Sequence, residues 1–460
     1  MTDSLTRRLA GFAASLTYAD LPPDVVDAAK RLTLDTLGTA LAATALADGC
    51  REVIDVMSAL GGAPQSSIIG TAVKVGAPNA AFANGALAHG LNYDAVGDEV
   101  GHTGVVCLSA PLAIAEARAP VSGRRFLTAV VVAAEVFARV VSAAMQPKRH
   151  IAQAILSGQY YGYFAAAAGA GSVLGLSPAA MHSAFGLALM QVSGSRQVLA
   201  EGDAPAKSIY GAFPNHGGVL AALLAEAGLA AEVNALDGSA GFYVLSSGGT
   251  FDPNVLADGL GMRFRFMETQ FKPWPTSGVI SAFIEAAIDL AQAHDLKAGD
   301  IAAVEIAGHS HMKQWCEPIA ERRRPSNASA AANRTLFATA TALAHRDVVL
   351  ADFTSAGLRD EVALGVADRT TYRFDDNVTG AIVTVRTVSG SVLEAAVEKP
   401  LGDPARPMSR ARLVAKFRDC CSYVAHLQAA DIDGLIAFID SLDQAEDVSR
   451  LSAAPRRDHP

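Results

Sequence analysis

Residues 84–104 hold the chain's densest group of side chains that could carry out chemistry. The stretch reads Asn-Gly-Ala-Leu-Ala-His-Gly-Leu-Asn-Tyr-Asp from 84 to 94 and reaches Gly-His-Thr-Gly at 101–104. It contains two histidines, His89 and His102, and two aspartates, Asp94 and Asp98. Sequence typical of buried helix flanks it, and titratable groups beside an apolar core are costly unless they are paired or used. We therefore expect the site here.

His102 is the candidate for proton transfer in this segment. Imidazole titrates near neutral pH, so His102 can act as a general base or acid. Asp94 or Asp98 could orient its ring, and the neighbouring Gly101 and Gly104 would let a substrate approach the backbone. We expect Asp94 to belong to the catalytic group.

Two further residues of the segment are candidates for substrate binding. His89 precedes Asp94 by five positions, and both a structural and a catalytic role stay open for it. Asn92 cannot act as a base, but its amide can hydrogen-bond a carboxylate or hydroxyl. A strand-like path would turn Asn92 and Asp94 to the same side, and a helical path would not.

Composition narrows the class of protein. The 460 residues carry a formal net charge of -9 with 18% charged residues, and the longest basic run is Arg-Arg-Arg at 322–324, so nucleic acid is not an expected partner. Small anionic molecules are the expected ligands. With 51% hydrophobic residues and 40 glycines, we expect closely packed helices and a homo-oligomer.

Cysteine usage and the apolar runs bear on location. The five cysteines are scattered without a C-x-x-C spacing, which fits a reducing cytoplasm, and we expect a cytoplasmic protein. Residues 151–195 contain no Asp, Glu, Lys or Arg, yet glycines and Pro178 interrupt the run. This pattern predicts buried helices rather than a membrane span.

The first half of the chain reads as helices. Leu-Pro-Pro-Asp-Val at 21–25 predicts a helix with proline in its first turn, and Ser177-Pro178 predicts another by the same capping logic. A helix is also expected over 124–145, and one over 212–227 that Pro214 interrupts. We therefore predict a helical domain over residues 1–263.

The pattern changes after residue 263. Period-two alternation predicts strands at 300–306, 381–385 and 392–397, and helical periods fall at 279–293 and 333–345. We predict a smaller α/β domain over 264–400 and a helical return to the first domain over 401–450, with helices after Ser409 and over 431–442. Residues 451–460 read as a disordered tail. The fold class is thus mainly α, a large helical domain with a smaller α/β domain.

Motifs along almost the whole chain resemble the MmgE/PrpD family. They comprise Asn84-Gly85 through Asp94, then His102, Pro111, Ala115-Glu116, Gly-Leu-Ser at 175–177, Lys207 with 217–223, Phe-Lys-Pro-Trp-Pro at 271–275, Pro407 with Ser409, and Lys416-Phe417. The resemblance implies a site in a cleft between two domains, homodimers, and substrates that are small di- and tricarboxylates. His102, Lys207 and Lys272 match the family's polar residues, whereas Asn92, Leu156 and Ala338 replace polar ones.

Chemistry on such substrates starts with a proton next to a carboxylate. The carboxylate needs cations as it becomes enediolate-like, and a base is needed nearby. We assign the cationic role to Lys207 and Lys272, and count both with His102 and Asp94 as catalytic candidates. The candidates for substrate binding are Asn92, His89, Arg196, Tyr160 and Trp274.

His309-Ser310-His311 resembles part of a metal site, because two histidines alternating on a strand share a face. A third ligand is not evident, and a polar strand end is the favoured interpretation. The sequence also lacks a phosphate loop, a Rossmann glycine pattern and a nucleophile elbow. We expect neither metal nor cofactor.

The leading prediction is a cofactor-independent lyase, a dehydratase or decarboxylase of a small carboxylic acid. The first alternative is an isomerase or epimerase, which needs only proton removal and return. The second is a non-catalytic paralogue that binds an acid, in keeping with the residues at 92, 156 and 338.

Overall fold

The computed structural model describes residues 4–145, 155–200 and 204–452. By their internal contacts these residues form two units. The first contains the chain up to Gly90, Asp94–Thr269 and the residues from Val414 onward, and the second contains Leu91–Tyr93 with Gln270–Leu413. The corresponding boundaries predicted from the sequence are residues 263 and 400.

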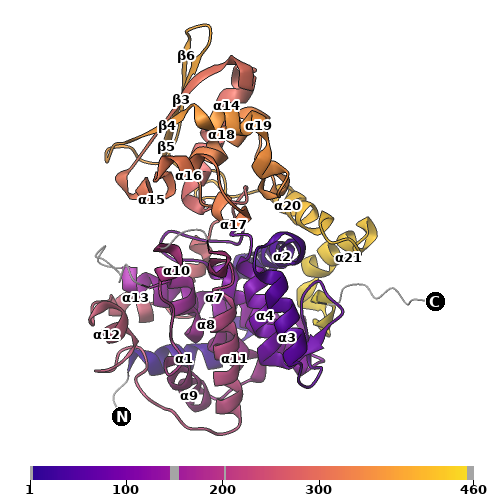
Figure 1. Cartoon of the computed structure of the whole chain (residues 1–460). Helices are drawn as coiled ribbons and strands as arrows, with labels where there is room; N and C mark the ends of the chain where they lie inside the picture. Colours follow the sequence, from indigo (N-terminus) through magenta and orange to yellow (C-terminus); the bar gives the residue numbers. More distant parts are fainter. Residues whose placement is uncertain (1–3, 146–154, 201–203, 453–460) are drawn as a thin grey trace, which may run out of the picture. The chain divides into compact units, whose positions relative to one another are not determined.

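The first unit is helical, with one two-stranded pairing of β1 (Ser66–Ser67) and β2 (Lys74–Val75). Its helices are α1 (Leu5–Ser15), α2 (Pro23–Leu46), α3 (Cys50–Leu60), α4 (Ala77–His89), α5 (Thr103–Cys107), α6 (Ser109–Ala117), α7 (Gly123–Met145), α8 (Ser157–Leu174), α9 (Pro178–Leu189), α10 (Gln197–Ala200), α11 (Ala212–Glu226), α12 (Phe242–Ser247), α13 (Pro253–Ala257), α21 (Ala429–Asp440) and most of α20 (Arg410–Ser422). Figure 1 shows the chain coloured by position.

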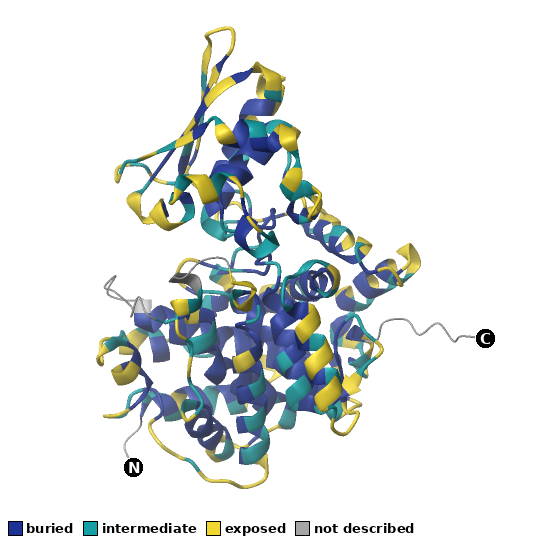
Figure 2. Cartoon of the chain, viewed as in Figure 1, coloured by how far each residue is buried: buried dark blue, intermediate teal, exposed yellow. Residues whose placement is uncertain are grey.

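Small residues let the central helices of this unit pack closely. The buried residues gather on α4, α7, α8 and α11 (Figure 2). At Gly218 of α11 an added Cβ would lie 2.5 Å from the Ala166 side chain of α8, so only glycine permits this approach. The described helices of the run without charged residues, α8 and α9, are thus core helices, as its composition predicts.

α7 is long and apolar enough to cross a membrane by length and composition. Its most apolar window is wholly buried within the protein, which is the environment of a core helix.

Capping explains where several helices begin. Ser177 accepts a hydrogen bond from the Ala180 N–H at the start of α9, and α2 begins at Pro23. The predicted interruption at Pro214 is wrong, because α11 runs unbroken from Ala212 to Glu226. Pro214 lies in the first turn, where the missing N–H would have no helical partner anyway.

The second unit is built on a four-stranded sheet of order β4-β3-β5-β6. Its strands are β3 (Ile301–Gly308), β4 (Thr370–Phe374), β5 (Ala381–Thr387) and β6 (Val392–Val397). β3 pairs parallel with β4 and antiparallel with β5, which pairs antiparallel with β6. β4 is not among the strands predicted from the sequence, although Thr-Thr-Tyr-Arg-Phe is rich in residues that favour strands.

Helices cover one face of this sheet. They are α14 (Ser281–Ala293), α18 (Thr335–His345) and α19 (Glu361–Asp368). The unit also contains the shorter helices α15 (Lys313–Cys316), α16 (Ile319–Arg323) and α17 (Ala328–Ala331). Val383 and Val385 of β5 point into the apolar core with Phe283 and Phe337. The predicted fold class, mainly α with a smaller α/β unit, is confirmed.

At the C-terminal end of the chain, Leu451 and Ser452 of the predicted tail are buried, and residues 453–460 lie outside the described residues.

Candidate active site

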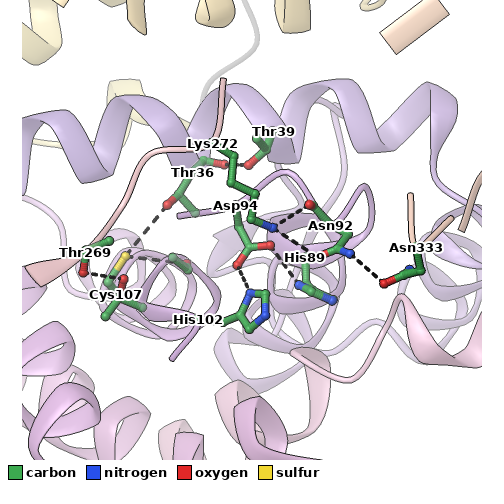
Figure 3. Close-up of polar contacts among 12 residues, drawn as sticks. Thr36, Thr39, His89, Asn92, Asp94, His102, Cys107, Thr269, Lys272 and Asn333 are labelled. Atoms are coloured by element: carbon green, nitrogen blue, oxygen red, sulfur yellow. Dashed lines mark hydrogen bonds and ion pairs between the residues drawn. The ribbon is translucent and has the colours of Figure 1, made fainter. Parts of the chain in front are cut away.

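Two histidines share one buried carboxylate in the helical unit. His89 Nδ1 lies 2.9 Å from Asp94 Oδ1, and His102 Nδ1 lies 2.9 Å from Asp94 Oδ2 (Figure 3). The side chain of Asp94 is 0% exposed, that of His89 2% and that of His102 25%. We call these three residues the Asp94 cluster. Its accessible member is His102.

Short local features set the positions of the cluster. His89 is the last residue of α4, and His102 is the residue before α5. Between them, Gly97 and Gly101 exchange backbone hydrogen bonds of 3.0 and 2.8 Å, which closes the loop that leads to His102. Of the two acids proposed to orient His102, Asp94 makes the contact and Asp98 is exposed.

At the glycines beside His102, protein atoms fill the space that a side chain would occupy, and the approach of a substrate to this backbone stays a prediction. An added Cβ at Gly104 would lie 3.2 Å from the Cβ of Asp94, and one at Gly101 would lie 3.1 Å from the ring of Phe137. Gly101 also has a φ of 66°, which favours glycine. Both glycines are there for packing and for the turn.

Hydrogen bonding fixes the tautomer of both rings. An ionised carboxylate only accepts hydrogen bonds, so each imidazole donates its Nδ1–H to Asp94 and keeps Nε2 for other partners. Burial lowers the pKa of His89 to about 4, although Asp94 opposes this. His89 is therefore neutral at neutral pH. His102, with its side chain a quarter exposed, can present Nε2 as base or acid.

Tyr210 belongs to this site and was missed from the sequence. Its ring centroid lies 4.1 Å from that of His89 and 6.2 Å from that of His102. Burial, together with the charge of Asp94, raises the pKa of Tyr210 well above its ordinary value of 10.0, so the phenol stays protonated. The chain separation between 210 and 89 left no local signal to find it.

A contact between two glycines brings Tyr210 to His89. An added Cβ at Gly85 of α4 would lie 2.4 Å from the carbonyl oxygen of Gly211, and one at Gly211 would lie 2.5 Å from that of Gly85. The segment carrying Tyr210 can therefore press against α4 one turn before His89. On the other side, an added Cβ at Gly158 would lie 2.4 Å from the Tyr210 ring.

Lys207 also lies within electrostatic range of the cluster. It ends a short 3-10 helix, Pro205–Lys207, and is half-buried rather than fully solvated. Its positive charge is one of the influences that lower the pKa of His89, after burial. The structure therefore groups Lys207 with His89.

The second unit holds Lys272 in a polar setting of its own. Its Nζ donates to the backbone carbonyl of Asn92 at 2.6 Å and to Asn92 Oδ1 at 3.1 Å (Figure 3), and its side chain is buried. Asn92 Nδ2 in turn donates to Asn333 Oδ1 at 3.3 Å. Tyr93 Oη donates to the Pro273 carbonyl at 2.9 Å and ties the same two segments together. Lys272 and Asn92, two of the residues predicted as candidates, are thus hydrogen-bonded to each other. Asn333, which was not predicted, is a further partner of Asn92.

The remaining candidates make other contacts. Trp274 is 4% exposed in the core of the second unit and donates from Nε1 to Asp347 at 3.2 Å. Tyr160 is half-buried with its ring 5.2 Å from that of Phe242, and Arg196 is half-buried just before α10. The packing of Trp274 assigns it to the core rather than to a ligand surface.

The His309 and His311 pair is not on a strand. β3 ends at Gly308, and residues 310–312 form a 3-10 turn, so strand alternation cannot give the two rings a common face. His309 Nδ1 and His311 Nδ1 lie 3.0 Å apart, as hydrogen-bonded neighbours.

Potential metal donors gather in one place within the described ranges. The donor atoms of His89, Asp94 and His102 lie within 4.8 Å of one another. Both oxygens of Asp94 already accept imidazole N–H groups, an arrangement that suits proton transfer directly. We therefore interpret the cluster as a proton-transfer group. That the protein works without metal or cofactor remains a prediction.

Taken together, these features define a class of protein: mainly helical, two-unit, with a buried carboxylate–histidine cluster and a buried lysine. Within this class, the model of the MmgE/PrpD N-terminal domain matches residues 7–254 and that of the C-terminal domain matches residues 274–437. The chain belongs to the MmgE/PrpD family, which confirms the resemblance read from its motifs.

Curated relatives carry related names. The chain is 27% identical to the cis-aconitate decarboxylase-like protein oryM of Aspergillus oryzae, over 98% of this chain and 97% of the relative. It is 25% identical to a cis-aconitate decarboxylase of Aspergillus terreus, over 98% and 96% of the two chains. A cis-aconitate decarboxylase of Homo sapiens is 29% identical over 56% of this chain and 53% of the relative.

Proposed function

We propose that this protein is a lyase that removes carbon dioxide or water from a small polycarboxylic acid. The reaction would be proton transfer at a carbon next to a carboxylate. One observation carries the proposal: accessible His102 is held through Nδ1 by the fully buried carboxylate of Asp94. Family membership and the names of the relatives support it.

His102 and Asp94 would divide the work of proton transfer. In a decarboxylation, the bond to the leaving carboxylate breaks, its electron pair passes to the neighbouring carbon, and protonated His102 Nε2 supplies the proton. In a dehydration, neutral His102 Nε2 removes the proton from the carbon, the electron pair left behind forms the double bond as the C–O bond breaks, and the imidazolium returns the proton to the departing hydroxyl, which leaves as water. In both reactions Asp94 stabilises the imidazolium form of His102, because the negative charge of Asp94 is buried and fixed in place.

The two lysines would bind the carboxylates of the substrate. A partly desolvated ammonium is stabilised by an anionic ligand, and carboxylate charge grows in the enediolate-like state. Lys207 supplies this charge in the helical unit, and Lys272, oriented by Asn92, supplies it in the second unit. Arg196 and Tyr160 stay candidates for substrate contacts, and Trp274 is left out as a core residue.

The test starts with turnover. Purified protein is incubated with cis-aconitate and with a panel of hydroxy-tricarboxylates, while carbon dioxide release and the absorbance of a new conjugated double bond are followed. Replacing His102 with Gln, Asp94 with Asn or Lys272 with Ala should lower kcat/KM by roughly 10²-fold or more. Absence of turnover, or variants that keep full activity, would refute the proposal.

A matched control separates chemistry from folding. His182 is also a buried histidine of the helical unit, but it bonds the Val233 carbonyl at 2.8 Å away from the cluster. His182→Gln should leave kcat/KM close to the wild-type value. Activity that survives dialysis against a chelator would support the expected independence from metal.

Heavy water tests the alternative reactions. Deuterium gained next to a carboxylate, with no loss of carbon dioxide or water, would indicate an isomerase or epimerase. Thermal stabilisation by polycarboxylates without any turnover or exchange would indicate a binding paralogue.

A further inference from the structure

We propose that His89 is a positioning residue that sets the proton affinity of His102 through the carboxylate they share. The catalytic consequence rests on the proposed function, whereas the electrostatic coupling can be measured without it. The basis is geometric: both Nδ1 atoms lie 2.9 Å from opposite oxygens of Asp94.

The coupling follows from how a carboxylate distributes its charge. A carboxylate that accepts a strong hydrogen bond at one oxygen offers less negative charge at the other. Asp94 is fully buried, so water cannot replace a missing donor. Each imidazole therefore weakens the hydrogen bond between Asp94 and the other ring.

His89 is suited to act as a constant donor. It is buried, and burial lowers its pKa to about 4, so His89 keeps one fixed protonation state while His102 changes charge. The rings of His89 and His102 lie 5.1 Å apart at 89°, so a second positive charge on His89 would oppose protonation of His102. A neutral His89 tunes Asp94 without competing for the proton.

The groups that face the cluster from the helical unit favour this neutral state. Lys207 disfavours a charge on His89. Tyr210 packs on its ring and, with its raised pKa, stays uncharged. Cys107 lies within electrostatic range of Asp94, and burial raises the pKa of this thiol to about 12, so it too stays uncharged. Asp94 is the carboxylate that contacts His102, at 2.9 Å.

Two substitutions at position 89 isolate the effect. His89→Leu removes the donor, and His89→Asn keeps an amide N–H near the position of Nδ1. In 15N-labelled protein, the pH midpoint of the His102 ring resonances should rise by about 0.5 to 1 unit in the Leu variant. It should stay near the wild-type value in the Asn variant and in the control His182→Gln. Resonances are assigned by their loss in His102→Gln.

The kinetic profile gives the catalytic readout. The limb of kcat/KM against pH that reports His102, the acidic limb for a dehydration and the basic limb for a decarboxylation, should move upward by the same amount in His89→Leu and remain in place in His89→Asn. An unmoved or lowered His102 midpoint in folded His89→Leu would overturn the coupling. A moved midpoint without any turnover would keep the coupling and refute the proposed function.

Two further measurements keep the test decisive. Should the Leu variant fail to fold, His89→Phe provides a ring of similar breadth without an N–H. In the wild-type protein, the nitrogen shifts of His89 should stay those of a neutral Nδ1–H ring from pH 5 to 9. Protonation of His89 within that range would overturn the proposal.

Discussion

At the scale of single residues, Asn92 answers a question that the sequence left open. Neither a strand-like nor a helical path carries the chain from Asn92 to Asp94, because Asn92 adopts a φ of 50° in the left-handed region. Asparagine tolerates this conformation better than most residues. The same residue supplies two oxygens to Lys272. Backbone and side chain thus both favour an amide here.

Asn92→Asp should weaken substrate binding. Aspartate also tolerates the left-handed backbone, but it would place a carboxylate about 3 Å from the ammonium of Lys272 and compete with the substrate for it. We expect KM to rise by roughly tenfold or more, a difference of about 1.4 kcal/mol in binding. Steady-state kinetics and ligand titration measure this. Asn92→Gly, which keeps the backbone without the carboxylate, is the control, and an unchanged KM in Asn92→Asp would contradict the role of Lys272.

His89 should also make folding stability depend on pH. Folding lowers the pKa of His89 from 6.5 to about 4, so between these pH values the unfolded chain binds a proton at His89 that the folded chain does not bind. The contribution of neutral His89 to the free energy of unfolding is complete above about pH 6.5. It is lost as the pH falls toward 4, and the loss is at most about 3 kcal/mol. Urea unfolding across this range should show a shallower slope for His89→Asn than for wild type. Parallel slopes would argue against a buried neutral His89.

At the scale of helices and strands, features with local signals could be predicted from the sequence, and contacts between distant residues could not. Caps and periodicity predicted α9 from Ser177, and β6 with its bounds, because these signals are local. The predicted break at Pro214 is wrong because the effect of a proline depends on where the helix begins, and Pro214 falls in the first turn of α11. Tyr210 escaped notice because its contact with His89 exists only through helix packing at Gly85 and Gly211.

Gly158→Ala tests that packing. The added methyl would lie 2.4 Å from the ring of Tyr210, which is itself buried, so the ring or α8 must shift. We expect a loss of about 1 to 3 kcal/mol in unfolding free energy, together with reduced activity. Gly11→Ala in α1 is the matched control: nothing lies within 4 Å of the new methyl, so stability should rise by up to about 1 kcal/mol. Equal effects of the two substitutions would contradict the packing argument.

A buried ion pair ties α20 to α2. Lys416 Nζ lies 2.6 Å from Asp35 Oδ1, with side chains 4% and 0% exposed, and Phe417 packs where Gly38 leaves room. Lys416→Met should lower the unfolding free energy by about 3 to 5 kcal/mol, because it strands a buried carboxylate. Adding Asp35→Leu should recover part of the loss. Thermal unfolding measures both, and a mild Lys416→Met would show that the pair is dispensable.

At the scale of the whole molecule, the cysteines lead to a further prediction. All five are free and buried, and burial raises the thiol pKa to about 12 for Cys50, Cys107 and Cys421 and to about 11 for Cys316. Thiolate is the reactive form, so a thiol reagent should find almost no fast-reacting group in the native protein and five after denaturation. A fast-reacting thiol in the native protein would reveal an opening of the core.

The homodimer and the cytoplasmic location stay predictions.

The tripeptide Leu91–Tyr93 belongs by its contacts to the second unit, although residues of the first unit precede and follow it in the chain. The smaller unit is therefore not one uninterrupted stretch of the gene. An exchange of residues 270–413 between relatives would separate Lys272 from the Asn92 with which it is matched. A chimera that keeps this pair matched must therefore take positions 91–93 and residues 270–413 from the same relative. The same holds for natural recombination between family members.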